Sequence, residues 1–152
     1  MRAVAACRVA PVVAEASEDA ELALECYGKN LGIAFQLTDD VIDYASDAAT
    51  MGKGVGDDFR DGKMTLPVIL AFARGNEADR AFWREAVSGV RISDADLDHA
   101  VGLLRSTGAL ADTIEQARHY GRRAIDALAI FPASKAKAAL VEAVEFAVAR
   151  AY

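Results

Sequence analysis

The sequence has little cysteine, and the placement of its two cysteines excludes two kinds of site. Cys7 and Cys26 each lie in an apolar helical pattern, with no second Cys or His at metal-ligand spacing. A disulfide framework requires several cysteines at regular spacing, and a zinc site requires Cys or His ligands in pairs. We therefore predict two reduced, buried thiols.

The sequence also lacks a basic cluster and a long apolar run. Its formal net charge is −6 and its pI is about 4.9, which disfavours nucleic acid as a partner because phosphate backbones are bound by clustered Lys and Arg. No apolar run reaches the ~18–20 residues of a membrane span, and residues 1–16 lack the polar cleavage region of a secretory signal. These absences predict a cytoplasmic protein with no transmembrane segment and with a cation as its partner.

What the sequence does contain is helical periodicity. It is 53% hydrophobic with only three prolines, and no alternating strand pattern competes with the 3.6-residue repeat. The pattern predicts an all-α bundle of about seven helices in one domain. Residues 2–16 are apolar almost all round and begin without a cap, which is typical of a buried helix entered part-way along. The expected helices cover residues 2–16, 20–47, 66–74, 77–87, 94–106, 109–129 and 134–150.

The longest of these helices carries a narrow acidic line. At 3.6 residues per turn one stripe holds Lys29, Gly32, Gln36, Asp39, Asp40, Asp43 and Asp47. The other faces hold Ile33, Phe35, Leu37, Val41 and Ile42. A solvated surface helix shows a broad polar face, whereas this helix is apolar on most sides. We therefore expect the stripe to face a cavity inside the bundle.

Three of the stripe aspartates are spaced as a cation site. Asp43 comes four residues after Asp39 and three after Asp40, so these like charges repel and favour a counter-ion. Oxygen ligands without His or Cys select hard cations, and Mg²⁺ takes one or two carboxylates together with water and phosphate oxygens. The hypothesis is a magnesium site that binds a diphosphate, and the alternative is a solvated acidic face. An EF-hand is excluded because residues 40–47 lack its ligand pattern.

The stretch after this helix, residues 48–63, is predicted to be a loop that carries cations. Lys53 and Lys63 bracket GKGVGDDFRDGK, where either ammonium can meet phosphate oxygens, and Arg60 is a weaker candidate. A Walker A loop is excluded because Gly56 and Gly62 enclose five residues and no Ser or Thr follows the lysine. The alternative is an ordinary surface loop.

Two runs carry a family resemblance. YGKNLGIAFQLTDDVIDY and MGKGVGDDFRDGKMTLPVIL resemble, nearly residue for residue, the second aspartate-rich region of the trans-polyprenyl diphosphate synthases. Weaker similarity continues through TGALADTIEQARHYGRRAIDAL to the FPAS turn and the last helix, and octaprenyl or related quinone-side-chain synthases look closest. The resemblance implies a partial helical bundle of the isoprenoid synthase type, with residues 1–152 as the C-terminal half of the synthase domain, and a homodimer or other homo-oligomer.

The resemblance also implies roles for named residues. Asp39, Asp40 and Asp43 would be the second DDxxD, which with a first DDxxD binds magnesium on the allylic diphosphate. Gln36, Lys53 and Lys63 match positions near the diphosphates, and Asp39, Asp40 and Lys53 would be the catalytic residues. The implied reaction condenses isopentenyl diphosphate with an allylic prenyl diphosphate by ionisation, attack of the double bond and proton loss.

The sequence departs from the family in what it omits. The first DDxxD, the basic residues that hold isopentenyl diphosphate, and a Lys-Thr pair ahead of the Cys7 region would all lie upstream of Met1. We therefore expect part of a longer prenyltransferase that is inactive alone, because stabilisation of the departing diphosphate is the largest catalytic contribution. The alternative is a non-catalytic helical partner subunit that docks through residues 2–16. A terpene cyclase is disfavoured, since its second metal motif usually combines Asn, Ser and Glu.

Overall fold

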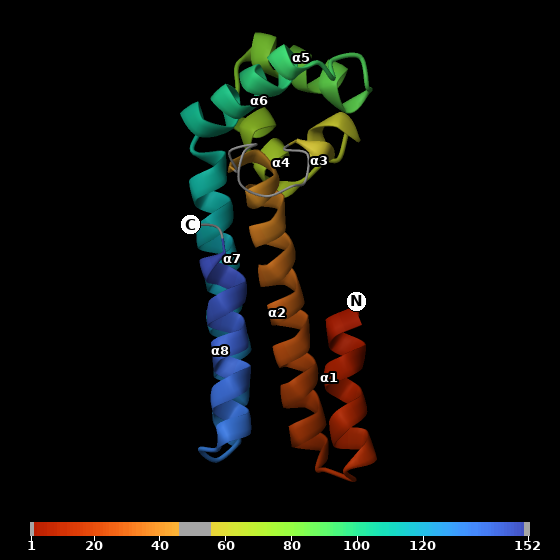
Figure 1. The fold of residues 1–152 in the computed structure, drawn as a ribbon, viewed down its shortest axis with the longest axis vertical. Helices are drawn as coiled ribbons and strands as arrows, with labels where there is room; N and C mark the ends of the chain where they lie inside the picture. Colours follow the sequence, from red (N-terminus) through yellow and green to blue (C-terminus); the bar gives the residue numbers. More distant parts are fainter. Residues whose placement is uncertain (1, 46–55, 151–152) are drawn as a thin grey trace. The chain divides into compact units, whose positions relative to one another are not determined.

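The computed structural model describes residues 2–45 and 56–150, and every regular element in those two ranges is helical (Figure 1). The prediction of an all-α protein is confirmed. No helix in the described ranges is long and apolar enough to cross a membrane. The elements are α1 (Arg2–Val13), α2 (Glu18–Ala45), α3 (Asp57–Arg60), α4 (Leu66–Arg74), α5 (Glu77–Val87), α6 (Asp94–Ser106), α7 (Ala109–Ala127), a 3-10 turn η1 (Leu128–Ile130) and α8 (Lys135–Ala149).

Helices α4, α5 and α6 have the predicted bounds because local signals fix their ends. The Ser93 hydroxyl accepts the backbone N–H of Asp96 at 3.2 Å, and the Asp96 carboxylate accepts the Ser93 N–H, which completes the predicted capping box of α6. Asn76 and Asp79 form a second capping box on α5. The first turn of α4 contains Pro67, where a missing N–H costs nothing.

Three predicted boundaries differ from the structure. Helix α1 ends at Val13 rather than at residue 16, because Glu15 adopts a left-handed φ of 49°. Helix α7 ends at Ala127 and tightens into η1, and Phe131 is extended because proline follows it. The predicted loop contains the helical turn α3, which forms where Phe59 is buried. Residues 46–55, including the predicted end of the second helix, lie outside the described ranges.

The described chain divides into two compact units, and the first comprises residues 2–38 and 115–150. Its core combines side chains of α2, α7, η1 and α8, namely Tyr27, Ala124, Leu128 and Val144, with partly buried neighbours that include Cys7 of α1. The Tyr27 hydroxyl donates to the Leu140 carbonyl at 2.9 Å and so joins α2 to α8. This bond crosses a large stretch of sequence and is specific to the folded state.

Removal of the Tyr27 hydroxyl tests how firmly α2 is joined to α8. We expect Tyr27→Phe to lower the free energy of unfolding by about 1 kcal/mol, because the hydrogen bond to the Leu140 carbonyl would be lost while the ring stays packed. Urea denaturation measures the change. Tyr120→Phe is the matched control, since the Tyr120 hydroxyl has no hydrogen bond within the described residues. Equal effects of the two substitutions would contradict the proposed contribution of this bond.

The exposure of side chains in the first unit bears on two predictions. Among the described side chains of α1 only Pro11 is buried, and Val9, Val12 and Val13 are 60%, 53% and 77% exposed. The helix therefore presents an open apolar face within this chain, as expected of a segment that docks on another surface. The prediction for Cys26 is wrong. The thiol of Cys26 is exposed rather than buried, because it lies on an outer face of α2, where its Sγ accepts a hydrogen bond from Asn30 at 3.3 Å.

The second unit comprises residues 39–45 and 56–114. Its core is aromatic: Phe82 stacks on Phe59 with ring centroids 6.4 Å apart and meets Trp83 edge-on at 5.4 Å. This core includes Tyr44, the last buried residue of α2, and so ties the end of the predicted acidic helix to α3, α4 and α5. The predicted acids and Lys63 are held by this unit.

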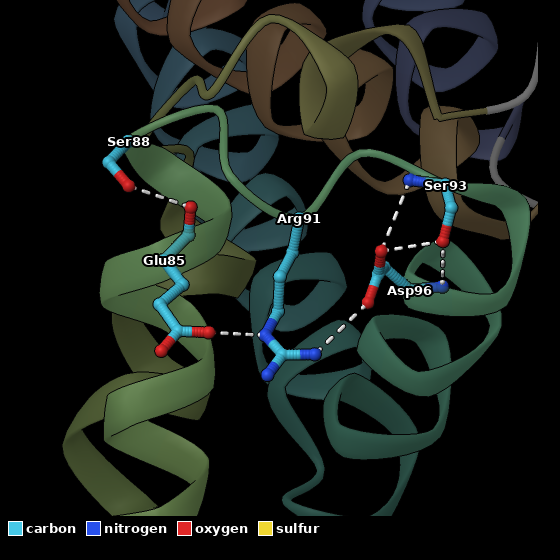
Figure 2. A network of polar contacts seen from close by, with 5 residues as sticks. All are labelled: Glu85, Ser88, Arg91, Ser93 and Asp96. Atoms are coloured by element: carbon cyan, nitrogen blue, oxygen red, sulfur yellow. Dashed lines mark hydrogen bonds and ion pairs between the residues drawn. The ribbon is translucent and has the colours of Figure 1, made fainter.

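A polar network joins α5 to α6 on the surface of the second unit (Figure 2). Arg91 Nε donates to Glu85 at 2.5 Å, and a second nitrogen of Arg91 lies 3.4 Å from Asp96. The Ser93 hydroxyl donates to Asp96, and the Ser88 hydroxyl donates to the Glu85 carbonyl. The network holds the short α5–α6 connection.

Candidate functional site

The three stripe aspartates lie on the last turns of α2 but differ in exposure. Asp40 is buried at 6% exposure, Asp43 is half-buried, and Asp39 is exposed, as is Gln36 one turn earlier. Successive residues of a helix point about 100° apart, which is why the neighbours Asp39 and Asp40 differ in exposure. That the whole stripe faces a cavity stays a prediction, and within this chain Gln36 and Asp39 are exposed.

The apolar faces of α2 are also only partly as predicted. Val41 is buried at 1% exposure, in agreement with the pattern. Phe35 is 43% exposed, and the guanidinium of Arg150 lies 4.4 Å from the centre of its ring. A cation over an aromatic face is a favourable contact. Phe35 is thus covered by a charged residue of the same unit rather than by the core.

Asp43 fixes the start of the segment that follows the undescribed residues. Its carbonyl accepts the Gly56 N–H at 2.9 Å, and its carboxylate accepts the Asp58 N–H at 3.1 Å. Burial raises the pKa of the Asp43 carboxyl, and the carboxylates of Asp58 and Asp57 raise it further against the opposing effect of the backbone hydrogen bonds. A cation placed here would relieve the crowding of negative charge.

Lys63 is tied to the same place through Asp58. Its ammonium lies 2.6 Å from the Asp58 carboxylate and 3.2 Å from that of Asp61, and these hydrogen bonds raise the pKa of Lys63. Because the Asp58 amide bonds to Asp43, a continuous polar connection runs from α2 to Lys63. Lys53 lies outside the described residues. Arg60 forms an ion pair with Asp94 at 2.8 Å. Its role in phosphate binding stays a prediction.

Sequence reasoning missed the acids of this segment, although a signal for them was present. Asp57, Asp58 and Asp61 repeat the DDxxD spacing directly before Lys63. The structure uses Asp58 and Asp61 to hold Lys63, and Asp57 lies 4.0 Å from Arg60. These carboxylates therefore neutralise cations of their own segment.

The three aspartates of α2 suit a magnesium ion that is bound together with a diphosphate, but they do not form a complete metal site by themselves. Within residues 2–45 and 56–150 no three His, Cys, Asp or Glu side chains converge as a metal site, so Asp39, Asp40 and Asp43 do not form a three-ligand cage. Their chemistry is nevertheless that of a hard-cation site, and Mg²⁺ commonly uses one or two carboxylates with water and phosphate oxygens. The arrangement fits an ion bound together with a diphosphate.

The family model and the curated relatives that match this chain agree with one another. The model of the polyprenyl synthetase family matches residues 2–104. The octaprenyl diphosphate synthase of Haemophilus influenzae is 37% identical over 145 residues, which are 95% of this chain and 44% of that protein. The chain thus spans less than half the length of this relative.

Solved structures resemble the fold over the same extent. The Caulobacter crescentus polyprenyl synthase, complexed with calcium and isoprenyl diphosphate, has a TM-score of 0.90 and 42% identity, and the match covers 99% of this chain and 46% of that one. The decaprenyl diphosphate synthase of Rhodobacter capsulatus has a TM-score of 0.90 and 40% identity, with the same two coverages. Nearly all of the chain has a counterpart in each, and about half of each has none here.

Proposed function

The chain belongs to the polyprenyl synthetase family and has the all-α fold of isoprenoid synthases, and from this we propose that it supplies the diphosphate-binding part of a trans-prenyltransferase. Residues 1–152 would be the C-terminal half of the synthase domain, with residues 39–43 as its second aspartate motif. The observation that carries the proposal is the connection from Asp43 through Asp58 to Lys63, which places carboxylates and an ammonium in one segment of the second unit. Within a longer enzyme this part would help to condense isopentenyl diphosphate with an allylic prenyl diphosphate.

Each residue has a defined task in this proposal. Asp39, Asp40 and Asp43 would hold Mg²⁺, which when bound stabilises negative charge on the leaving diphosphate. Lys53 and Lys63 would donate hydrogen bonds to the phosphate oxygens, and Gln36 would donate its amide N–H from one turn earlier on α2. Asp58 would orient Lys63 until phosphate arrives, since both compete for the same ammonium protons. The product is proposed to be octaprenyl-like, because the Haemophilus influenzae relative is an octaprenyl diphosphate synthase.

Calorimetric titration with inorganic pyrophosphate tests the binding proposal on the chain itself. We expect pyrophosphate to bind only when magnesium is present, because the carboxylates repel a bare anion. Incubation with farnesyl diphosphate, labelled isopentenyl diphosphate and magnesium should yield no longer prenyl diphosphates from chain of confirmed intact mass. Magnesium-independent binding, or none at all, would contradict the binding site, and elongation by the chain alone would contradict the incomplete active site.

A second candidate is a non-catalytic partner subunit of a full-length synthase, and the exposed valines of α1 favour it. Apolar faces of this kind seldom stay open in monomers. Sedimentation of the chain alone and with a full-length relative separates the possibilities. A mixed complex supports the partner subunit, a homo-oligomer supports self-association through α1, and a stable monomer contradicts both.

A further inference from the structure

Helices α7 and α8 enclose a groove of about 410 Å³ in the first unit, and the proposed function uses none of the residues that line it. Each of the two helices contributes four lining residues. A volume of this size is typical of a site for a small molecule. The groove is therefore a candidate binding site of its own.

The floor of the groove is apolar. Ile125 lies one turn after Gly121 on α7, and Val148 lies one turn after Val144 on α8. Residues four apart share a helix face, so each helix contributes one apolar row. Gly121 lets the two helices pack closely here, because a Cβ at this position would lie 3.1 Å from Val148 Cγ2 and 3.3 Å from Val144 Cγ1. The two apolar rows together suit a hydrocarbon chain.

The rim of the groove is charged. Arg122 of α7 and Glu145 of α8 are exposed, and the side chain of neither forms an ion pair or a hydrogen bond with residues 2–45 or 56–150. Arg118, which also lines the groove, forms an ion pair with Glu115 of its own helix. The lining thus contains two guanidinium groups and one carboxylate, in a chain with a formal net charge of −6. A positive rim on an acidic protein favours an anionic ligand.

We propose that the α7–α8 groove binds a single lipid anion, whose hydrocarbon chain lies along the two apolar rows and whose phosphate head accepts hydrogen bonds from Arg122. A guanidinium offers two parallel N–H donors to a phosphate. An anionic bilayer is a poorer partner, because it repels a chain with a net charge of −6 and because the apolar residues line a groove rather than a projecting face. The inference does not depend on the proposed function, since no aspartate of α2 lines the groove.

Titration of the full chain with dodecyl phosphate, below its micelle concentration and with EDTA present, tests the site. EDTA removes magnesium, so that diphosphate binding by the aspartates of α2 does not contribute and the two proposals are tested separately. Nuclear magnetic resonance follows the methyl groups of Ile125, Val144 and Val148. Inorganic phosphate and dodecanol present the head and the chain alone, and vesicles of phosphatidylglycerol present a bilayer. Farnesyl phosphate is titrated in parallel, and the tighter ligand shows whether the groove prefers a prenyl or a straight chain.

Three charge variants examine the rim. Arg122→Gln should weaken dodecyl phosphate binding about tenfold, because it removes a charge-assisted contact. Glu145→Gln should strengthen binding severalfold, because the carboxylate repels the phosphate. Arg123→Gln is the matched control: it removes the same charge from the next residue of α7, which lies over the ring of Tyr120 and does not line the groove. Binding by this control should be unchanged, and all three variants should keep the melting temperature.

The expected result is a set of methyl shifts at the apolar rows, with dodecyl phosphate bound more tightly than phosphate or dodecanol. Absence of these shifts, equal weakening by Arg122→Gln and Arg123→Gln, or binding to vesicles alone would overturn the proposal. Methyl shifts that change on dilution of the chain without ligand would show a second copy in the groove and would overturn it as well. Failure of magnesium-dependent pyrophosphate binding would count against the proposed function and leave this result unaffected.

Discussion

Replacement of Gly62 by alanine is expected to destabilise the protein by about 3 kcal/mol and to displace Lys63. Gly62 has a φ of 64°, and left-handed backbone costs a residue with a Cβ about 1–2 kcal/mol. The added Cβ would also lie 2.6 Å from the Val87 carbonyl oxygen, a backbone atom that cannot rotate away. Overpacking of this kind typically adds about 1–3 kcal/mol. Because Lys63 follows directly, relief of the overlap must move it.

Gly89 offers a control with the same backbone conformation and no neighbour. Its φ is 78°, and a Cβ there would meet nothing within 4 Å. Gly89→Ala should therefore lose only the backbone contribution of about 1–2 kcal/mol. Urea denaturation measures both variants, and magnesium-dependent pyrophosphate binding should weaken in Gly62→Ala alone. Equal losses of stability would show that the approach of Gly62 to Val87 is looser than the structure indicates.

The helices of the second unit could be predicted because their ends are encoded locally. The Ser93 and Asp96 box, the Pro67 turn and the change to glycine and serine after α5 each act within a few residues. Such signals need no tertiary contact to be recognised. The turn α3 gives no comparable signal, because four residues among glycines do not establish a period and its formation follows the burial of Phe59.

Burial could be predicted less well than helix position, because it depends on which other surface is present. The pattern of residues 2–16 predicts an apolar helix and does not specify what covers it, so the exposed fraction of a single side chain such as Val13 does not follow from the pattern. The difference in exposure between Asp39 and the buried Asp40 likewise depends on where the core of the second unit lies. The ion pairs of Lys63 could have been predicted from the sequence, since Asp58 and Asp61 are only five and two residues before it.

The combined substitution of Asp39, Asp40 and Asp43 by asparagine is expected to abolish magnesium-dependent pyrophosphate binding. Asparagine keeps the size of aspartate and removes the charge that a hard cation requires. Contacts to charged groups are worth about 1.5–3 kcal/mol each, so the loss of three should weaken binding by at least about a hundredfold. The fold should survive, because an asparagine oxygen at position 43 can still accept the Asp58 N–H.

A charge-matched variant separates a specific site from the general acidity of the protein. Asp98→Asn, Asp126→Asn and Glu142→Gln together remove the same three negative charges from exposed positions of α6, α7 and α8. If the site is local, this control binds magnesium and pyrophosphate as the unsubstituted chain does, while the stripe variant binds neither. The stripe variant should also melt no lower, because Asp40 and Asp43 lie one turn apart and repel each other. Equal weakening in the two variants would show that net charge, rather than the aspartates of α2, attracts the ion, and equal affinity of the stripe variant and the unsubstituted chain would remove the basis of the proposed function.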